Sequence, residues 1–333
     1  MLNSSKRAPR KSFTAVTVPL CLAAIFAVVA VPYVRRYGLT ISAAAGIYGC
    51  FVLLLLLALA PGLAFSRDSI GPRIARLLWF LPLLWCAPYL IYAAGTFDFR
   101  WPALTRLLVV GAGLPLIYRL SPVRDLERFN WQDLLAAVWL IAALMGHQLA
   151  GIWTVPTNLD FLGRLFLICI GSWTWTFLRP VPRLGYDFSI SLKGLGIAAW
   201  NFALFAVIAL PASLALHFTQ WNPPHTGLAA FAVSFLEIFL FIALLEELFF
   251  RGFLQTLVSR SIGSAWVGQA VISCLFGLFH ILHAPFPNWK YVLLATVAGW
   301  FYGTAFVKSG GLMASALTHA MVDTVWRAFF SKS

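Results

Sequence analysis

Three short clusters in the C-terminal third of the chain carry side chains that could perform acid–base chemistry. They are Glu246-Glu247-Leu248-Phe249-Phe250-Arg251, Phe276-Gly277-Leu278-Phe279-His280 and His319-Ala320-Met321-Val322-Asp323. Each cluster lies in an apolar run, and an ionised side chain at the middle of a bilayer costs about 2.5–3.5 kcal/mol. The simplest reason for keeping these polar residues is that they meet one another in a single polar cavity.

Helical spacing allows these side chains to meet. Glu247 and Arg251 are four positions apart and can form an ion pair on one face, while Glu246 lies about 100° around the same helix. His319 and Asp323 are also four positions apart. At about 1.5 Å per residue, the acids and histidines of the three clusters fall at depths from which they can reach one cavity.

A carboxylate and an imidazole in such a cavity could hydrolyse a peptide bond. If a Glu and a His contact the same water, they can deprotonate it for attack on a carbonyl carbon. A second His, together with an acid or amide, can donate hydrogen bonds to the oxyanion that forms. The same residue types also suit a divalent metal, because carboxylates and imidazoles are zinc ligands.

In this order the clusters resemble the EExxxR, FxxxH and HxxxN/D motifs of the CPBP or Abi family, the CAAX-processing and bacteriocin-processing intramembrane proteases. The resemblance covers roughly residues 190–330. It implies that Glu246 is the catalytic carboxylate and that His280 is its partner on the water. It also implies that Glu247 and Arg251 hold the first helix of the site in place.

By the same resemblance, His319 and Asp323 stabilise the oxyanion. Asp323 stands where some family members have Asn, and an ionised carboxylate would repel an oxyanion, so it must be protonated, bind His319 or ligate a metal. We predict that activity needs no cofactor, because no ligand pair falls in a known zinc motif. The alternative is a zinc-dependent enzyme with a metal site built from Glu246, His280, His319 and Asp323.

The elements that position these residues are predicted to be membrane-spanning helices. Hydrophobic residues make up 61% of the 333 positions and charged residues 11%, whereas about a quarter of a soluble domain is charged. We therefore predict an all-α, polytopic transmembrane bundle of about 10–11 spans with an Abi/CAAX-protease-like C-terminal core. The candidate spans are 13–34, 41–65, 74–94, 102–118, 133–152, 160–178, 194–216, 230–258, 264–283, 290–307 and 311–330.

A short connection that contains Pro180 and Pro182 separates two parts of different composition. Before it, the spans hold few ionisable groups and many aromatic residues, and after it, carboxylates and histidines appear within the spans. We predict an N-terminal multi-span region of unassigned role over 1–182 and a CPBP/Abi-like protease domain over 183–333.

The net charge of +13 is spread singly over short connections, with no basic helix. This distribution argues against nucleic-acid binding and indicates contacts with anionic lipid headgroups. Basic residues are frequent in 66–76, 119–130 and 179–193, which we place in the cytoplasm. The N-terminus, with Lys6, Arg7, Arg10 and Lys11 before a long apolar run, is then cytoplasmic, the first helix uncleaved, and the protein located in a plasma or inner membrane.

The predicted function is intramembrane hydrolysis of a peptide bond in a membrane-associated or prenylated protein. Two alternatives remain open: a proton-coupled transporter, for which paired Glu and His in spans are also typical, and a non-catalytic membrane scaffold of the same fold. No HExxH or GxGD motif points to another class of intramembrane protease. We interpret His147 as a packing residue, and His283, three residues after His280, either as an interfacial residue or as part of the lining of the same cavity.

Overall fold

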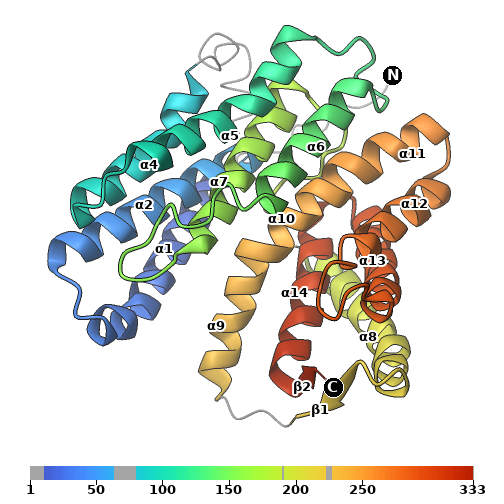
Figure 1. The fold of residues 1–333 in the computed structure, drawn as a ribbon. Coiled ribbons are helices and arrows are strands. Elements are labelled where there is room, and N and C mark those ends of the chain that lie inside the picture. Colours follow the sequence, from blue (N-terminus) through green and yellow to red (C-terminus); the bar gives the residue numbers. More distant parts are fainter. Residues whose placement is uncertain (1–10, 64–79, 190, 223–226, 333) are drawn as a thin grey trace.

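The computed structural model describes residues 11–63, 80–189, 191–222 and 227–332, and 76% of them are in helices (Figure 1). Lys6, Arg7, Arg10 and the whole of the predicted loop 66–76 lie outside the described residues. Within the described part the predicted all-α fold is confirmed, and each of the eleven predicted spans contains a helix.

The first group of helices precedes residue 180. It comprises α1 (Lys11–Arg36), α2 (Ile41–Leu59) with a 3₁₀ turn over Ala60–Gly62, α4 (Leu81–Thr96), α5 (Trp101–Leu120), α6 (Trp131–Met145) and α7 (Asp160–Trp173), which continues as a π-helical turn over Thr174–Leu178. In Figure 1 these helices lie side by side from blue to light green. The chain leaves them through the proline-containing connection.

The second group follows that connection. It comprises α8 (Leu192–Ala215), α9 (Leu228–Ile238), α10 (Leu244–Glu247), α11 (Thr256–Ile262), α12 (Ala265–Leu278), α13 (Trp289–Ser309) and α14 (Leu312–Phe329). Strands β1 (Thr219–Trp221) and β2 (Phe330–Lys332) pair antiparallel beside the ends of α8 and α14. Helices α9, α10 and α11 form one continuous rod, Leu228–Ile262, which we call the motif helix.

Six helical segments are long and apolar enough to cross a membrane, by length and composition, among the residues that the structure describes. They are Ile41–Gly62, Trp101–Leu120, Asp160–Leu178, Leu192–Ala215, Leu228–Ile262 and Trp289–Ser309. The protein is therefore an integral, multi-pass membrane protein, as predicted. The segment 102–118, which Arg106 interrupts, forms one helix of 20 residues.

Three predicted spans form helices that are shorter than predicted: α4, α6 and α12. Helix α6 ends at Met145, and His147 then adopts a left-handed backbone conformation with φ of 51°. Helix α12 ends at Leu278, and the chain turns toward Pro285 and Pro287, which lack the N–H needed to continue a helix. Apolar residues continue past both helix ends, so the spans predicted from composition are longer than the helices that form.

Polar residues at the helix starts explain several boundaries. The side chain of Ser191 accepts a hydrogen bond from Gly194 N at the start of α8, Ser264 does so from Val267 N at α12, and Asn288 does so from Tyr291 N at α13. Such caps satisfy backbone donors that the first helical turn leaves free. They fix the points at which α8, α12 and α13 begin.

Helix α7 joins the two groups. It packs against the motif helix and against α2. Trp175, in the π-helical turn after α7, stacks on Phe253 of the motif helix, with ring centroids 4.3 Å apart and an interplanar angle of 12°. Within the first group, α2 and α4 approach so closely that a Cβ on Gly46 would lie 2.7 Å from Gly95 Cα, a packing typical of small residues between membrane helices.

Candidate active site

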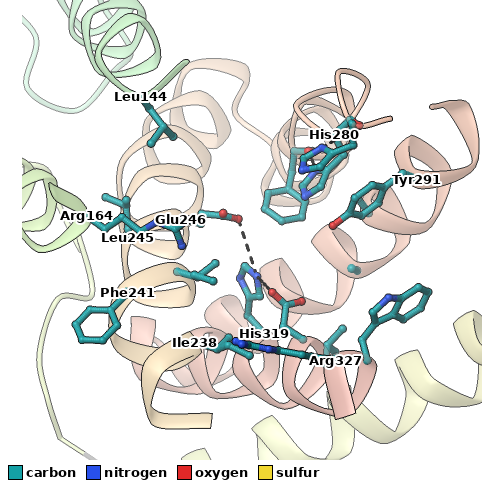
Figure 2. Close-up of a pocket in the computed structure, with 18 of the residues that line it drawn as sticks. Leu144, Arg164, Ile238, Phe241, Leu245, Glu246, His280, Tyr291, His319 and Arg327 are labelled. Atoms are coloured by element: carbon teal, nitrogen blue, oxygen red, sulfur yellow. Dashed lines mark hydrogen bonds and ion pairs between the residues drawn. The ribbon is translucent and has the colours of Figure 1, made fainter. Parts of the chain in front are cut away.

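A cavity of about 720 Å³ lies between the two groups of helices. Its walls come from α6 and α7 on one side, and from the motif helix, α12, α13 and α14 on the other. Glu246, His280, His319 and Asp323 all line it (Figure 2). The structure thus brings the three motifs of the sequence together at one place.

The motif helix changes its winding on both sides of the paired glutamates. Residues Phe239–Ala243 and Leu248–Gln255 are π-helical and flank the four-residue segment Leu244–Glu247. π-helical turns are rare and are frequently found at functional sites. Here the wider turns set the direction of two adjacent carboxylates: Glu246 is 31% exposed and lines the cavity, whereas Glu247 is fully buried.

Glu247 is the centre of a buried polar network. Its Oε2 atom lies 3.2 Å from Arg251 Nε and accepts a hydrogen bond of 2.5 Å from the hydroxyl of Ser315. Its Oε1 atom is 2.8 Å from His319 Nδ1. The ion pair expected from the sequence spacing is present, and in addition Glu247 holds a side chain of α14. Through these contacts it fixes the motif helix and His319 relative to one another.

Arg251 is held among backbone and aromatic groups. Its Nη2 donates to the carbonyl of Gly299 at 2.9 Å, and the guanidinium lies 4.7 Å from the ring centroid of Phe276 and 5.4 Å from that of Tyr302. A Cβ on Gly299 would lie 3.2 Å from Nη2, so a glycine there permits the close approach. These cation–π and charge-assisted contacts offset part of the desolvation of a fully buried cation.

His319 is oriented at both ring nitrogens. With Nδ1 at the Glu247 carboxylate, Nδ1 carries a proton and donates it, because an ionised carboxylate only accepts. Its Nε2 atom lies 3.4 Å from Asp323 Oδ2 and 3.9 Å from Glu246 Oε2, and the latter pair is drawn in Figure 2. The ring stacks on Tyr302 at 4.4 Å and 14°. Glu247 and Tyr302 therefore direct Nε2 toward the cavity.

His280 lies beyond the end of α12, and not within the helix as the predicted span 264–283 implied. Its Nδ1 is 2.9 Å from the carbonyl of Phe276 and must donate to it. In the neutral ring, Nε2 is then the acceptor and can take a proton. No hydrogen bond or ion pair joins Glu246 to His280, so any concerted action of these two described residues requires a molecule between them.

Several cavity residues were missed in the sequence or interpreted differently. His147 lines the cavity, although the sequence suggested a packing role, and His283 lines it as well, which was one of the two roles considered for it. Tyr291 lines it as well, with its ring 4.5 Å from that of His280 and its hydroxyl directed inward (Figure 2). Arg164 and Arg327 complete its charged lining. These residues belong to no motif, and an isolated polar residue in an apolar run carries little signal.

The cavity contains His, Asp and Glu side chains, which are residue types that can bind a metal ion. Over the described ranges, no group of three or more His, Cys, Asp or Glu side chains is placed to hold a metal. His319 Nδ1 already donates to Glu247, and His280 Nδ1 to Phe276, which leaves one nitrogen of each ring facing the cavity. The residues in this arrangement do not fit a zinc site, which needs four ligands at about 2.0–2.2 Å.

Comparison with known proteins identifies the region that carries this geometry. Residues 228–325 match the family model described as type II CAAX prenyl endopeptidase Rce1-like. The matched region begins with the motif helix and contains all six predicted site residues, which confirms the resemblance drawn from the three motifs. Comparison with curated proteins and with solved structures gave no match.

Proposed function

We propose that this protein, which matches the type II CAAX prenyl endopeptidase model over residues 228–325, hydrolyses a peptide bond of a membrane-associated or prenylated protein within the bilayer. The observation that carries the proposal is one cavity, in the region of the family match, that presents Glu246, His280, His319 and Asp323 together. The division into an N-terminal region, 1–182, and a protease domain, 183–333, is part of the proposal. The cavity uses walls from both.

The proposed nucleophile is a water held between Glu246 and His280. The free Nε2 of His280 and the carboxylate of Glu246 both accept hydrogen bonds, so together they can orient the water and take its proton as it attacks the scissile carbonyl. The same proton can then pass to the leaving amine. General base catalysis of this kind contributes about 10²–10⁴-fold in rate.

His319 is the proposed oxyanion donor. Its Nδ1 is engaged by Glu247, so only Nε2 can donate into the cavity. Asp323, at 3.4 Å from Nε2, is positioned to bind His319 and keep the ring protonated on that nitrogen. Of the options for Asp323 that the sequence left open, this one is supported by the contact. A single oxyanion donor typically contributes about 10²–10³-fold in rate.

The proposal is tested by comparing membranes that carry the intact protein with membranes that carry Glu246→Gln. We expect a processed terminus of a membrane or lipidated protein that is present with the intact protein and lost with the variant. Mass spectrometry of protein termini measures it. Processing that survives Glu246→Gln would contradict the proposed chemistry, and proton-coupled flux that depends on Glu246 would assign the residue to transport.

We also propose that the reaction requires no bound metal. The support is that, among the residues that the structure describes, no three His, Cys, Asp or Glu side chains are placed to hold one metal ion. Purified protein dialysed against a strong chelator should keep its activity, with metal content measured on the same sample. Activity that disappears and returns with one equivalent of zinc would make Glu246 the base of a metalloprotease.

A further inference from the structure

Two arginines line the cavity, one from each group of helices. Arg164 projects from α7, and Arg327 from the last turn of α14. Neither forms a hydrogen bond or an ion pair with any other residue that the structure describes. Arg164 is partly buried and extends toward the cavity beside Leu245 and Glu246 (Figure 2), whereas Arg327 is exposed.

The other arginines buried in the helical groups have partners. Arg179 pairs with Asp133, Arg251 pairs with Glu247, and Arg106 donates to the carbonyl of Ala150 at 3.1 Å. A cation at membrane depth is costly unless it meets an anion or a carbonyl. Arg164 is therefore the exception, and its guanidinium has the donors for one further acceptor group.

The acids of the cavity do not serve this purpose. Glu246 and Asp323 are directed to His319 Nε2, at 3.9 and 3.4 Å. Asp160 lies one helical turn before Arg164 on the same helix and also lines the cavity, yet the two form no ion pair. The hydrogen-bond donors of Arg164 are therefore available to a bound molecule.

A peptide substrate offers one obligatory anion. Its backbone is neutral along its length, and only its C-terminus always carries a carboxylate, which arginine can bind through two parallel hydrogen bonds. The cavity lining combines many apolar side chains with a few charged ones, so an apolar peptide end suits its walls and a terminal carboxylate suits Arg164.

On the basis of the proposed endopeptidase function, we propose that Arg164 binds the C-terminal carboxylate of the substrate. The N-terminal region would then help to select the substrate by restricting cleavage to bonds near a free C-terminus. Arg164 is a specificity-determining residue in this proposal and takes no part in the activation of water.

The test compares two fluorescent farnesylated CAAX peptides that differ only at the C-terminus, one a free acid and the other a carboxamide. Binding is measured on purified Glu246→Gln protein in detergent, so no turnover is needed. We expect the acid to bind at least about tenfold more tightly than the amide, as for a charge-assisted hydrogen bond. Arg164→Gln should remove this difference by weakening the acid alone, and Arg164→Lys should keep part of it.

Control variants separate the possible outcomes. Arg106→Gln, a half-buried arginine outside the cavity, should leave the difference between acid and amide intact. A difference that survives Arg164→Gln and disappears in Arg327→Gln would overturn the assignment in favour of α14. Equal binding of acid and amide by the protein with Arg164 intact would also overturn it, whether or not Arg164→Gln folds.

Cleavage by protein with an intact Glu246 distinguishes this proposal from the proposed function. If neither peptide is cleaved and the acid still binds through Arg164, the endopeptidase assignment fails and the carboxylate site stands. If both peptides are cleaved with equal KM, the endopeptidase assignment stands and the carboxylate site fails. An equal fall in kcat for acid and amide in Arg164→Gln, at unchanged KM, would assign Arg164 to the oxyanion and overturn the proposal.

Discussion

Two fully buried arginine–carboxylate pairs, one in each group of helices, can be compared directly. Arg179 pairs with Asp133 through Nε at 3.0 Å, and Arg251 pairs with Glu247 through Nε at 3.2 Å. Burial of such pairs is costly, and removal of one partner leaves an uncompensated charge. The two pairs differ in where their remaining contacts lead.

The further hydrogen bonds of the Asp133–Arg179 pair all involve residues in or beside the connection between α5 and α6. Asp133 also accepts from the hydroxyl of Tyr118 and from Asn130 N, and Arg179 donates to the carbonyls of Leu126 and Arg128. All of these contacts hold the connection between α5 and α6. The Glu247 pair instead continues through His319 into the cavity. The comparison shows that burial and charge do not identify a functional pair, and that the difference lies in whether the network opens to a cavity.

The largest effects are expected at the cavity residues that are proposed to hold the water, Glu246 and His280. Glu246→Ala and His280→Ala should each reduce cleavage by at least about a hundredfold. The double variant should be no worse than either single variant, because residues that act as one unit are not additive. Cleavage rates of purified variants, normalised to protein inserted in the membrane, provide the measurement. Additive losses would mean that the two residues do not share a water.

The next effect contrasts the two buried pairs with matched isosteric changes. Asp133→Asn and Glu247→Gln should each cost about 3–5 kcal/mol of stability, since each leaves an arginine unpaired. Only Glu247→Gln should also lower kcat of the folded fraction, because it releases His319. Thermal unfolding in detergent measures the loss of stability. The value of kcat, determined at a temperature below the unfolding transition, measures the loss of activity. A matching loss of kcat in Asp133→Asn would remove the distinction between the pairs.

A smaller effect is expected at Ser315, which donates to Glu247 Oε2 and is also 2.8 Å from the carbonyl of Tyr302. Ser315→Ala should cost about 1–3 kcal/mol and reduce activity less than Glu247→Gln. Thr324→Ala is the control on the same helix, because that hydroxyl bonds only the carbonyl of Ala320. If both variants behave alike, Ser315 contributes to helix stability and not to the network.

The smallest effect is expected at the surface contact between the two groups of helices. Arg260 of α11 forms an ion pair with Glu127, and both side chains are partly exposed. Solvent screens such pairs, so Arg260→Gln should change stability by about 0–1 kcal/mol, and less at high salt. Thermal unfolding at two salt concentrations measures this. A loss as large as that of Asp133→Asn would show that the contact is part of the core.

The sequence predicted most of what depends on local spacing. The all-α membrane fold follows from composition, and the Glu247–Arg251 pair follows from four-residue spacing on one helix. The contact between Glu247 and His319 could not be read in this way, because 72 residues separate the two. The same holds for Asp133 and Arg179, which are 46 residues apart.

The sequence was weakest where apolar composition is uniform. The position of His280 depends on where α12 ends, and the apolar run continues past that point. The π-helical segments of the motif helix have the same composition as an α-helix, so hydropathy does not distinguish them. The contribution of α7 to the cavity was missed because Arg164 is a single charge in an apolar run with no motif around it.

The π-helical turns also bear on how single-residue gaps near the motif should be read. An α-helix advances about 100° per residue, and a π-helical turn accommodates one residue more than an α-helical turn. A deletion within Phe239–Ala243 that restored regular α-helical winding would hardly shorten the motif helix. It would also leave the residues before the paired glutamates in nearly the same rotational position, because the π-helical turn takes up its extra residue within a single turn. At this position, a gap of one residue in an alignment is compatible with the same flanking side chains facing the cavity.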